Sequence, residues 1–336
     1  MEHLLWLSLP ENNDIMVTAG ISPHLAISIV VPVYNEQEVF PALIQRLMSL
    51  LDELGKAVEV ILVDDGSCDS TGQLIDHVCG ADARFIGLHL SRNFGHQAAV
   101  SAGIAHAKGE AIAVIDGDLQ DPPELIPVLL NKMREGYDVV YAIREDRKEH
   151  VLKRFCYSLY YRLLAALSPI PIPLDSGDFG IISRKVADVL NSMPERRRFV
   201  RGLRSYAGFS QIGLPYRRAP RASGCPKYSL LKLLRLAADG IFTFSELPLR
   251  ISTLIGLMVA ILSLAYGVYL LAWRLTTQQQ LPGFATLAIG LFFLGSVQLI
   301  CIGILGEYIG RIHSEVKQRP PYIIREIKSR NIFLNQ

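Results

Sequence analysis

The chain has 336 residues, of which 50% are hydrophobic and 20% are charged, and its mean hydropathy is +0.27. This length allows one large domain or two modest ones, and the apolar excess lies above the usual range of a soluble enzyme. A formal net charge of only +2 indicates no nucleic-acid partner. Because the five cysteines include no CxxC pair, the sequence predicts neither a zinc site nor a disulfide framework.

From residue 27 onward, short apolar segments of strand length alternate with helical segments. Residues 1–26 form an N-terminal tail, whose apolar patch lacks the basic residues that open a signal peptide. The alternation predicts an α/β fold with a parallel, doubly wound sheet and a site at the carboxyl ends of its strands. The predicted strands are Ile27–Val33, Val58–Val63, Phe85–Leu90, Ala111–Ile115 and, later in the chain, Tyr137–Ile143.

Polar loops follow these strands and fall at one edge of the predicted sheet. The loop after the first strand contains no Gly-x-Gly-x-x-Gly and no Walker-type Gly-Lys-Ser/Thr, so a dinucleotide dehydrogenase and a P-loop enzyme are both poor interpretations. The loop after the second strand begins Asp64-Asp65-Gly66-Ser67, which alone is typical of a helix-capping turn. Arg92 and His96, near the third strand, are interpreted as surface or packing residues.

The fourth strand ends in Asp116-Gly117-Asp118-Leu119-Gln120. On an extended backbone alternate side chains point the same way, so Asp116, Asp118 and Gln120 are expected to converge. Such oxygen ligands suit Mg²⁺ or Mn²⁺, and a cation of this kind most often holds a diphosphate. The alternative is a turn with solvated acids, because Asp and Gly are ordinary turn residues.

Two long uncharged segments lie in the C-terminal third of the chain. Residues 251–273 and 284–306 are each long enough to cross a bilayer core as a helix, and they predict a transmembrane hairpin. Basic residues gather outside the hairpin at both ends, while its connecting loop holds a single arginine. Both ends are therefore expected in the cytoplasm. Gly303, Gly306 and Gly310 give the second span a small-residue face compatible with self-association.

Four motifs together resemble a known family. In chain order they are Val31-Pro32-Val33-Tyr34-Asn35-Glu36, the segment 63–71 around Asp64-Asp65, Ser91-Arg92-Asn93-Phe94-Gly95, and the segment 116–122. They resemble the inverting glycosyltransferases of the GT-A fold and, more closely, the polyprenyl-phosphate glycosyltransferases of family two type. The resemblance covers about residues 27–319. It implies a Rossmann-like, mostly parallel sheet flanked by helices and followed by amphipathic juxtamembrane helices and a two-helix transmembrane hairpin. The expected parts are a catalytic domain (27–229), juxtamembrane helices (230–250), two spans (251–273 and 284–306) and a C-terminal tail (307–336).

The resemblance implies roles for residues on the nucleotide-sugar side. Pro32, Tyr34 and Glu36 are expected to line the nucleotide pocket, Asp65 to contact the base or ribose with Asp64 close by, and Asp116 to lie near the ribose and sugar. Asp118 and Gln120 are expected to bind the divalent metal, which neutralises the departing diphosphate.

On the acceptor side, the resemblance implies that Arg144 contacts the lipid phosphate, with Arg147 a weaker candidate. Asp178, in what resembles a second acidic turn (residues 175–179), is expected to be a general base or a positioning residue. Positioning is favoured, because a phosphate monoester is largely dianionic near neutral pH and attacks without proton removal. Arg201 belongs to a basic segment, residues 196–202, that is expected to bind anionic lipid head groups or to line the diphosphate pocket. Lys227 resembles part of a flexible loop that closes over the site.

The predicted function is transfer of one sugar from a UDP- or GDP-sugar to a polyprenyl phosphate by an inner-membrane enzyme whose catalytic domain and C-terminal tail are cytoplasmic. One alternative is a processive polysaccharide synthase of the same fold, for which two spans are too few to form a polymer channel. Another is a non-catalytic subunit that binds nucleotide sugar and assembles with a partner. The sequence does not decide which sugar is moved.

Overall fold

The computed structural model describes residues 27–55, 57–145, 176–196, 198–217, 247–277 and 283–330. The expectations for the tail 1–26, for Arg147, for Lys227 and for most of the juxtamembrane segment lie outside these residues. The side chain of Arg144 lies outside them as well, although its backbone is part of a described strand.

Within the described residues, eight strands form one sheet in the order β7-β5-β6-β4-β1-β2-β3-β8. The predicted strands are confirmed with small changes of boundary, and β4, β1, β2 and β3 pair in parallel as expected. The strands are β1 (Ile27–Val33), β2 (Val58–Asp64), β3 (Phe85–Leu90), β4 (Ala111–Val114), β5 (Val139–Glu145), β6 (Ser176–Ser183), β7 (Gln211–Arg217) and β8 (Ile324–Ser329).

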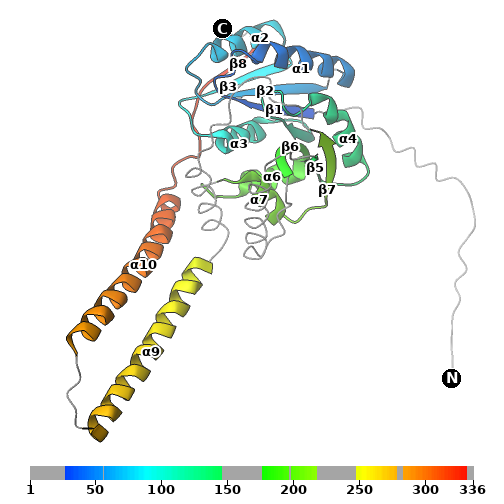
Figure 1. The fold of residues 1–336 in the computed structure, drawn as a ribbon. Helices are drawn as coiled ribbons and strands as arrows, with labels where there is room; N and C mark the ends of the chain where they lie inside the picture. Colours follow the sequence, from blue (N-terminus) through cyan, green and yellow to red (C-terminus); the bar gives the residue numbers. More distant parts are fainter. Residues whose placement is uncertain are drawn as a thin grey trace, which may run out of the picture.

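Helices cover both faces of this sheet, which buries one apolar cluster on each face (Figure 1). Residues of α1, α2 and α4 contribute to one cluster, and residues of α3, α6 and α7 to the other. α1 begins with Phe40 and Pro41 and buries Leu43, Leu47 and Leu50 at helical spacing, which explains its amphipathic placement. The helices are α1 (Phe40–Leu54), α2 (Thr71–Ala81), α3 (His96–His106), a 3-10 turn η1 (Pro123–Leu125), α4 (Ile126–Arg134), α6 (Arg184–Ser192), α7 (Val200–Tyr206), α9 (Leu247–Thr277) and α10 (Phe284–Val316).

The small residues of α3 let this helix lie directly on β1. A Cβ atom on Gly103 would come 2.1 Å from Cγ1 of Val30, so glycine is required for this close approach. The helix starts at His96, and its first turn therefore lies at the edge where the parallel strands end.

β6 departs from the predicted parallel order, because it runs antiparallel to both β4 and β5. The expectation of an acidic turn is wrong for residues 176–179, which begin this strand. Two neighbours supply hydrogen-bonding partners on both sides of β6, and Phe179 and Ile181 alternate into the core. Val114 pairs with Gly180, so continuing the register places Asp178 level with Asp116 at the carboxyl edge of the parallel strands.

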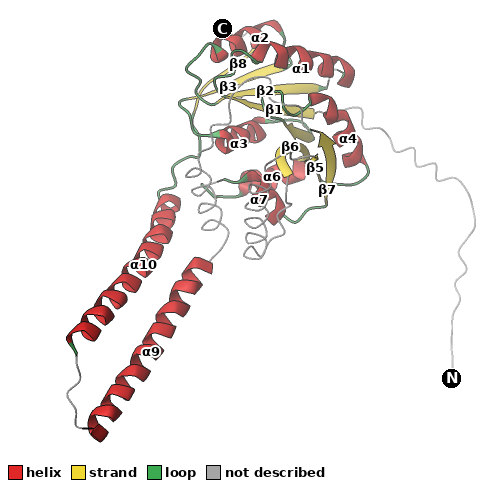
Figure 2. Cartoon of the chain, viewed as in Figure 1, coloured by secondary structure: helices red, strands yellow, loops and turns green. Residues whose placement is uncertain are grey.

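α9 and α10 contain the two predicted spans and project together away from the sheet and its helices (Figure 2). The spans, Leu249–Trp273 and Ile289–Val316, are long and apolar enough to cross a membrane and are not buried against protein. After α10 the chain returns to the sheet. There β8 pairs antiparallel with β3, and the Ser91 amide donates to the Ile323 carbonyl at 2.9 Å.

Candidate active site

The loops after β1 and β2 hold each other at the carboxyl edge of the sheet. The Asn35 amide donates to Oγ of Ser67 at 3.0 Å, and Oδ1 of Asn35 accepts from the Cys68 amide at 2.8 Å. These two bonds hold the loop after β1 against the loop after β2. The side chain of the preceding residue, Tyr34, is 43% exposed. Glu36 is half-buried in the same loop, whereas Pro32 is buried within β1. Of the three residues expected around the nucleotide, Tyr34 is therefore the most accessible.

Asp64 is buried and forms a chain of hydrogen bonds with a buried histidine. Its Oδ1 accepts from the Ser67 amide at 2.8 Å, and its Oδ2 lies 3.0 Å from Nδ1 of His89. Nε2 of His89 lies 2.9 Å from Oδ1 of Asp76. Burial acts to lower the pKa of His89, but the two carboxylates outweigh burial and raise this pKa. Burial acts to raise the pKa of Asp64, but the hydrogen bonds from His89 and Ser67 outweigh burial and lower it. Asp64 therefore fixes the loop rather than projecting from it.

Asp65 connects the loop after β2 to the start of α3. Its two carboxylate oxygens accept from the amides of Phe94 and Gly95 at 2.7 and 2.9 Å. The next residue, Gly66, has a φ of +70°, and a Cβ atom there would lie 2.4 Å from the carbonyl carbon of Arg92. Burial raises the pKa of Asp65 although both amide bonds oppose the shift. Asp65 thus binds backbone in this structure, and its contact with a base or ribose stays a prediction.

His96 lies between the carboxylates of Asp116 and Asp178. Its Nε2 is 3.5 Å from Oδ1 of Asp116 and 3.3 Å from Oδ2 of Asp178. Asp178 is only 7% exposed, whereas His96 is 44% exposed and faces the open side of the cluster. The first turn of α3 and the antiparallel β6 thus bring together one cation and two acids from three separate elements. The interpretation of His96 as a surface or packing residue missed this position.

α7 and α3 complete the surroundings of Asp178. Nε of Arg201 donates to Oδ1 of Asp178 at 2.9 Å, and the amide nitrogen of Gln97 donates to Oδ2 at 2.7 Å. Oε1 of Gln97 in turn accepts from the Val200 amide at 2.9 Å. The guanidinium of Arg204, on the same helix, is buried with its carbon 4.9 Å from the centre of the Tyr141 ring. Arg201 therefore points into the acidic cluster, and its expected role at the diphosphate or at lipid head groups stays a prediction.

These contacts move the pKa values of the two acids in opposite directions. Burial acts to raise the pKa of Asp178, but the hydrogen bond from His96 and the charge of Arg201 outweigh it and hold the pKa at about 2. Burial raises the pKa of Asp116 to about 6, and the nearby charge of His96 offsets only part of this rise. Asp178 is consequently ionised throughout the neutral range and has little tendency to accept a proton.

Asp118 and Gln120 form a compact turn directly after Asp116. The Gln120 amide donates to Oδ1 of Asp118 at 3.1 Å, and Leu119 between them has a φ of +58°. Within the described ranges, no group of three or more His, Cys, Asp or Glu side chains is arranged to hold a metal. One carboxylate and one amide oxygen nevertheless fit Mg²⁺, which is usually held by one or two protein carboxylates together with phosphate oxygens and water.

Sequence reasoning found the acids of this site and Arg201, but not the other partners of Asp178. His96, Gln97 and Arg204 carry no motif of their own. The signal that was available is the loop Ser91–Gly95 immediately before α3, because a loop at the carboxyl edge directs the first turn of the following helix toward the site.

Comparison with known proteins identifies the family. Residues 28–190 match the profile described as glycosyl transferase family 2, and residues 247–312 match that of the GtrB C-terminal hairpin. A glycosyltransferase of Synechocystis sp. is 44% identical over 306 residues, covering 90% of this chain and 96% of that protein. The SfII prophage-derived bactoprenol glucosyl transferase of Shigella flexneri is 41% identical over 303 residues, covering 90% and 98%.

Among solved structures, glucosyl-3-phosphoglycerate synthase from Mycobacterium tuberculosis, in complex with Mn²⁺, UDP and glucosyl-3-phosphoglycerate, gives a TM-score of 0.47 at 23% identity. That match covers 65% of this chain and 78% of the other. The alignments with these two relatives cover nearly the whole length of both relatives. In this chain they extend through the catalytic domain and the hairpin. The chain belongs to glycosyltransferase family 2.

Proposed function

We propose that this protein transfers one sugar from a nucleotide sugar to a polyprenyl phosphate at the membrane surface and inverts the configuration at C1. The observation that carries this proposal is the likeness to bactoprenol glucosyl transferases, which extends through the catalytic domain and the hairpin. A hairpin beside the catalytic sheet suits an acceptor whose long isoprenoid stays in the lipid. A water-soluble enzyme would have to withdraw that chain at a cost of about 0.8 kcal/mol per CH₂ group.

The state of Asp178 supports a phosphate acceptor. His96 and Arg201 hold the pKa of this acid at about 2, which disfavours a general base for an alcohol acceptor. A phosphate monoester already carries a nucleophilic oxygen anion near neutral pH. In the proposed step this oxygen forms a bond to C1 of the sugar while the bond from C1 to the diphosphate oxygen breaks, and the electron pair leaves with the diphosphate. Asp178 then acts by holding His96 and Arg201 in position.

The donor is proposed to lie along the carboxyl edge of the sheet. Tyr34 and Glu36 line the part of the donor site that takes the nucleotide. Asp64 and Asp65 keep the neighbouring loops in place. Asp116 faces the sugar, while Asp118 and Gln120 hold Mg²⁺ or Mn²⁺. The bound ion neutralises charge on the departing diphosphate. His96, which is partly exposed between the two acids, is positioned to donate to a phosphate oxygen.

We further propose that the catalytic domain and the tail face the cytoplasm of a bacterial inner membrane. The excess of basic residues outside both ends of the hairpin supports this orientation. Arg144, Arg201 and Lys227 are the proposed phosphate-binding cations. The first of these occupies β5, where its backbone pairs with that of Tyr216 in β7.

The test is a membrane assay with radiolabelled UDP-glucose, UDP-N-acetylglucosamine, UDP-aminoarabinose and GDP-mannose, each with undecaprenyl phosphate. The expected product is a single-sugar lipid that partitions into organic solvent and forms only with a divalent metal. A water-insoluble polymer would indicate the processive synthase instead. Donor binding without any lipid-linked product, with several polyprenyl phosphates tried, would indicate a non-catalytic subunit.

A further inference from the structure

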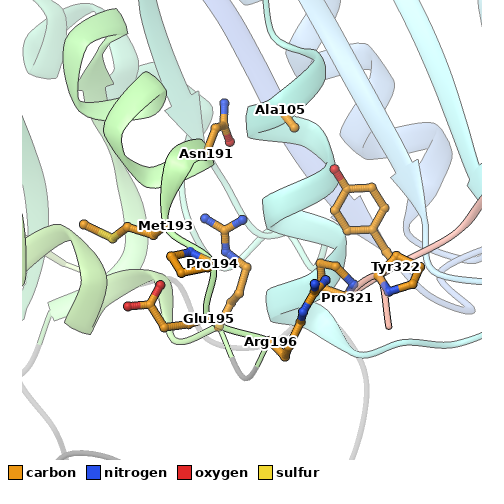
Figure 3. Close-up of a pocket in the computed structure, with 10 residues that line it drawn as sticks. Ala105, Asn191, Met193, Pro194, Glu195, Arg196, Pro321 and Tyr322 are labelled. Atoms are coloured by element: carbon orange, nitrogen blue, oxygen red, sulfur yellow. The ribbon is translucent and has the colours of Figure 1, made fainter. Parts of the chain in front are cut away.

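A cavity of about 350 Å³ lies at the end of α3 that is remote from the acidic cluster. Figure 3 shows Asn191, Met193 and Pro194 on one side of the cavity and Tyr322 on the other. Among the described residues, Ala105, Glu195, Arg196 and Arg198 also line the cavity. Ala105 and His96 are nine residues apart on α3, which separates the cavity from the acidic cluster by about 14 Å along the helix axis.

The basic segment 196–202 divides between these two places. Arg201 points into the acidic cluster, whereas Arg196 and Arg198 line the cavity. The guanidinium of Arg198 is partly buried and donates from Nη2 to the Leu190 carbonyl near the end of α6. Its Nε is fully buried and, within the described residues, has no hydrogen-bond partner. Other parts of Arg198 border the cavity, and a guanidinium in the wall of a cavity favours an oxyanion as a partner.

The other polar groups of the cavity support an anion. Burial raises the pKa of the Tyr322 hydroxyl, with the charge of Arg198 opposing this rise, so the hydroxyl is a neutral donor near that guanidinium. Asn191 contributes an amide. Glu195 carries the opposite charge; burial lowers the pKa of Arg198, and the charge of Glu195 opposes part of this shift. Two arginines and one glutamate leave one net positive charge in the lining, which suits a monoanion.

The cavity lies beside the cytoplasmic end proposed for the second span. The Arg196 amide donates to both carboxylate oxygens of Glu315, at 3.2 and 3.1 Å, and Glu315 is in the last turn of α10. Pro320, Pro321 and Tyr322 belong to the segment that joins α10 to β8. A group at the membrane surface can therefore reach the lining without entering the acidic cluster.

We infer that this cavity binds a singly charged phosphate ester, with the phosphate held by Arg198, Tyr322 and Asn191. The nearest source of such a group is the head group of an acidic phospholipid in the leaflet around α10, and a free phosphodiester such as glycerophosphoglycerol has the same chemistry. Filling the cavity links α6, the segment after α10 and the lipid. The bound phosphate thereby helps to hold the catalytic domain against the membrane.

The test is native mass spectrometry of the full chain in mild detergent, titrated with dioleoyl phosphatidylglycerol, dioleoyl phosphatidylcholine or the soluble diester glycerophosphoglycerol. We expect saturable retention of one phosphatidylglycerol and not of phosphatidylcholine. Arg198→Gln should weaken this binding about tenfold or more, the effect of losing one charge-assisted hydrogen bond. Arg134→Gln, which removes an exposed arginine of α4, is the matched control and should leave binding unchanged.

Glu195→Gln keeps the test decisive if the Arg198 variant folds poorly. Removing the only acid of the lining should strengthen phosphatidylglycerol binding several-fold. Saturable binding of glycerophosphoglycerol that displaces the lipid and is weakened by Arg198→Gln would identify the soluble ester as the ligand of the same site. Equal retention of the two lipids, or binding of phosphatidylglycerol unaffected by both Arg198→Gln and Glu195→Gln, would overturn the inference.

Discussion

Arg201 donates a hydrogen bond of 2.9 Å to Oδ1 of Asp178, and this contact joins α7 to the first residues of an antiparallel strand. Asp178 is 7% exposed, so the cation acts on a carboxylate with little solvent around it. A buried acid close to a guanidinium stays ionised at pH values where an isolated buried acid would be protonated. The charge state of the site therefore depends on residues outside the sheet.

Arg201→Gln should lower kcat/KM by about 100-fold, because it removes a cation from the proposed site of phosphate transfer. The substitution should also make kcat/KM fall on the acid side of its pH profile. Without the guanidinium, burial raises the pKa of Asp178 from about 2 toward the assay range, so activity falls as the pH is lowered from 8 to 5. The measurement is the pH profile of kcat/KM for both proteins. Arg134→Gln should leave the wild-type profile unchanged, and parallel profiles for Arg201→Gln and wild type would contradict the role given to Arg201.

Asp118→Asn should reduce turnover by about 100-fold or more, because the variant loses the one carboxylate proposed to bind the metal. Isothermal titration of Mn²⁺ in the presence of UDP should show weakened metal binding, while circular dichroism shows an unchanged fold. The matched control is Asp188→Asn on the exposed face of α6. Wild-type turnover by Asp118→Asn would remove Asp118 from the proposed metal site.

Gly66→Ala should destabilise the catalytic domain by about 1–3 kcal/mol, the cost of a strained backbone position. The φ of +70° disfavours any side chain, and the added Cβ would lie 2.4 Å from the backbone of Arg92. Gly80→Ala is the control, since no atom lies within 4 Å of the Cβ added there, and in α2 alanine should be neutral or stabilising. Thermal unfolding of the detergent-solubilised chain measures both variants. Equal unfolding temperatures for Gly66→Ala and Gly80→Ala would show that the loop after β2 adjusts to the added methyl group without cost.

His89→Gln should destabilise the fold by about 1–3 kcal/mol, because it leaves a buried carboxylate of Asp64 without a charged partner. The loss should depend on pH. The raised pKa of His89 means that its contribution is complete below about pH 6.5, the ordinary value, and disappears as the pH rises through the raised value. The difference in unfolding temperature between wild type and variant should therefore be larger at pH 6 than at pH 9. The control is His77→Gln, which replaces an exposed histidine of α2 and should show no such pH dependence. If the difference in unfolding temperature between wild type and His89→Gln is the same at pH 6 and pH 9, His89 is not a charged imidazolium in the folded protein.

The strands that the sequence predicted share one physical property. β1 to β4 are buried on both faces, so their apolar runs are continuous and end in polar loops that mark the carboxyl edge. From this the positions of Asp65, Asp116 and Asp118 at one edge followed directly. The pairing of strands that are distant in the chain could not be predicted from the sequence in this way, because no local pattern indicates which strand lies beside which.

Two strands show why the rest of the fold was missed. β6 begins Ser-Gly-Asp, which is the composition of a turn, and it becomes a strand only because β4 and β5 pair with its two sides. β8 has the sequence IREIKS and lies at the edge of the sheet, where neither face needs an apolar row. His96 was missed for a related reason. A single histidine is chemically ambiguous until the fold places acids around it.

The pairing of β8 with β3 has a consequence for biosynthesis. β8 follows both membrane helices in the chain, so one side of β3 stays without its partner strand until the whole hairpin has left the ribosome. The parallel strands that carry the acids can assemble earlier, because they come first in the sequence. The catalytic sheet is thus begun in water and finished only after the membrane anchor has been made, which couples the last step of folding to the arrival of the protein at its bilayer.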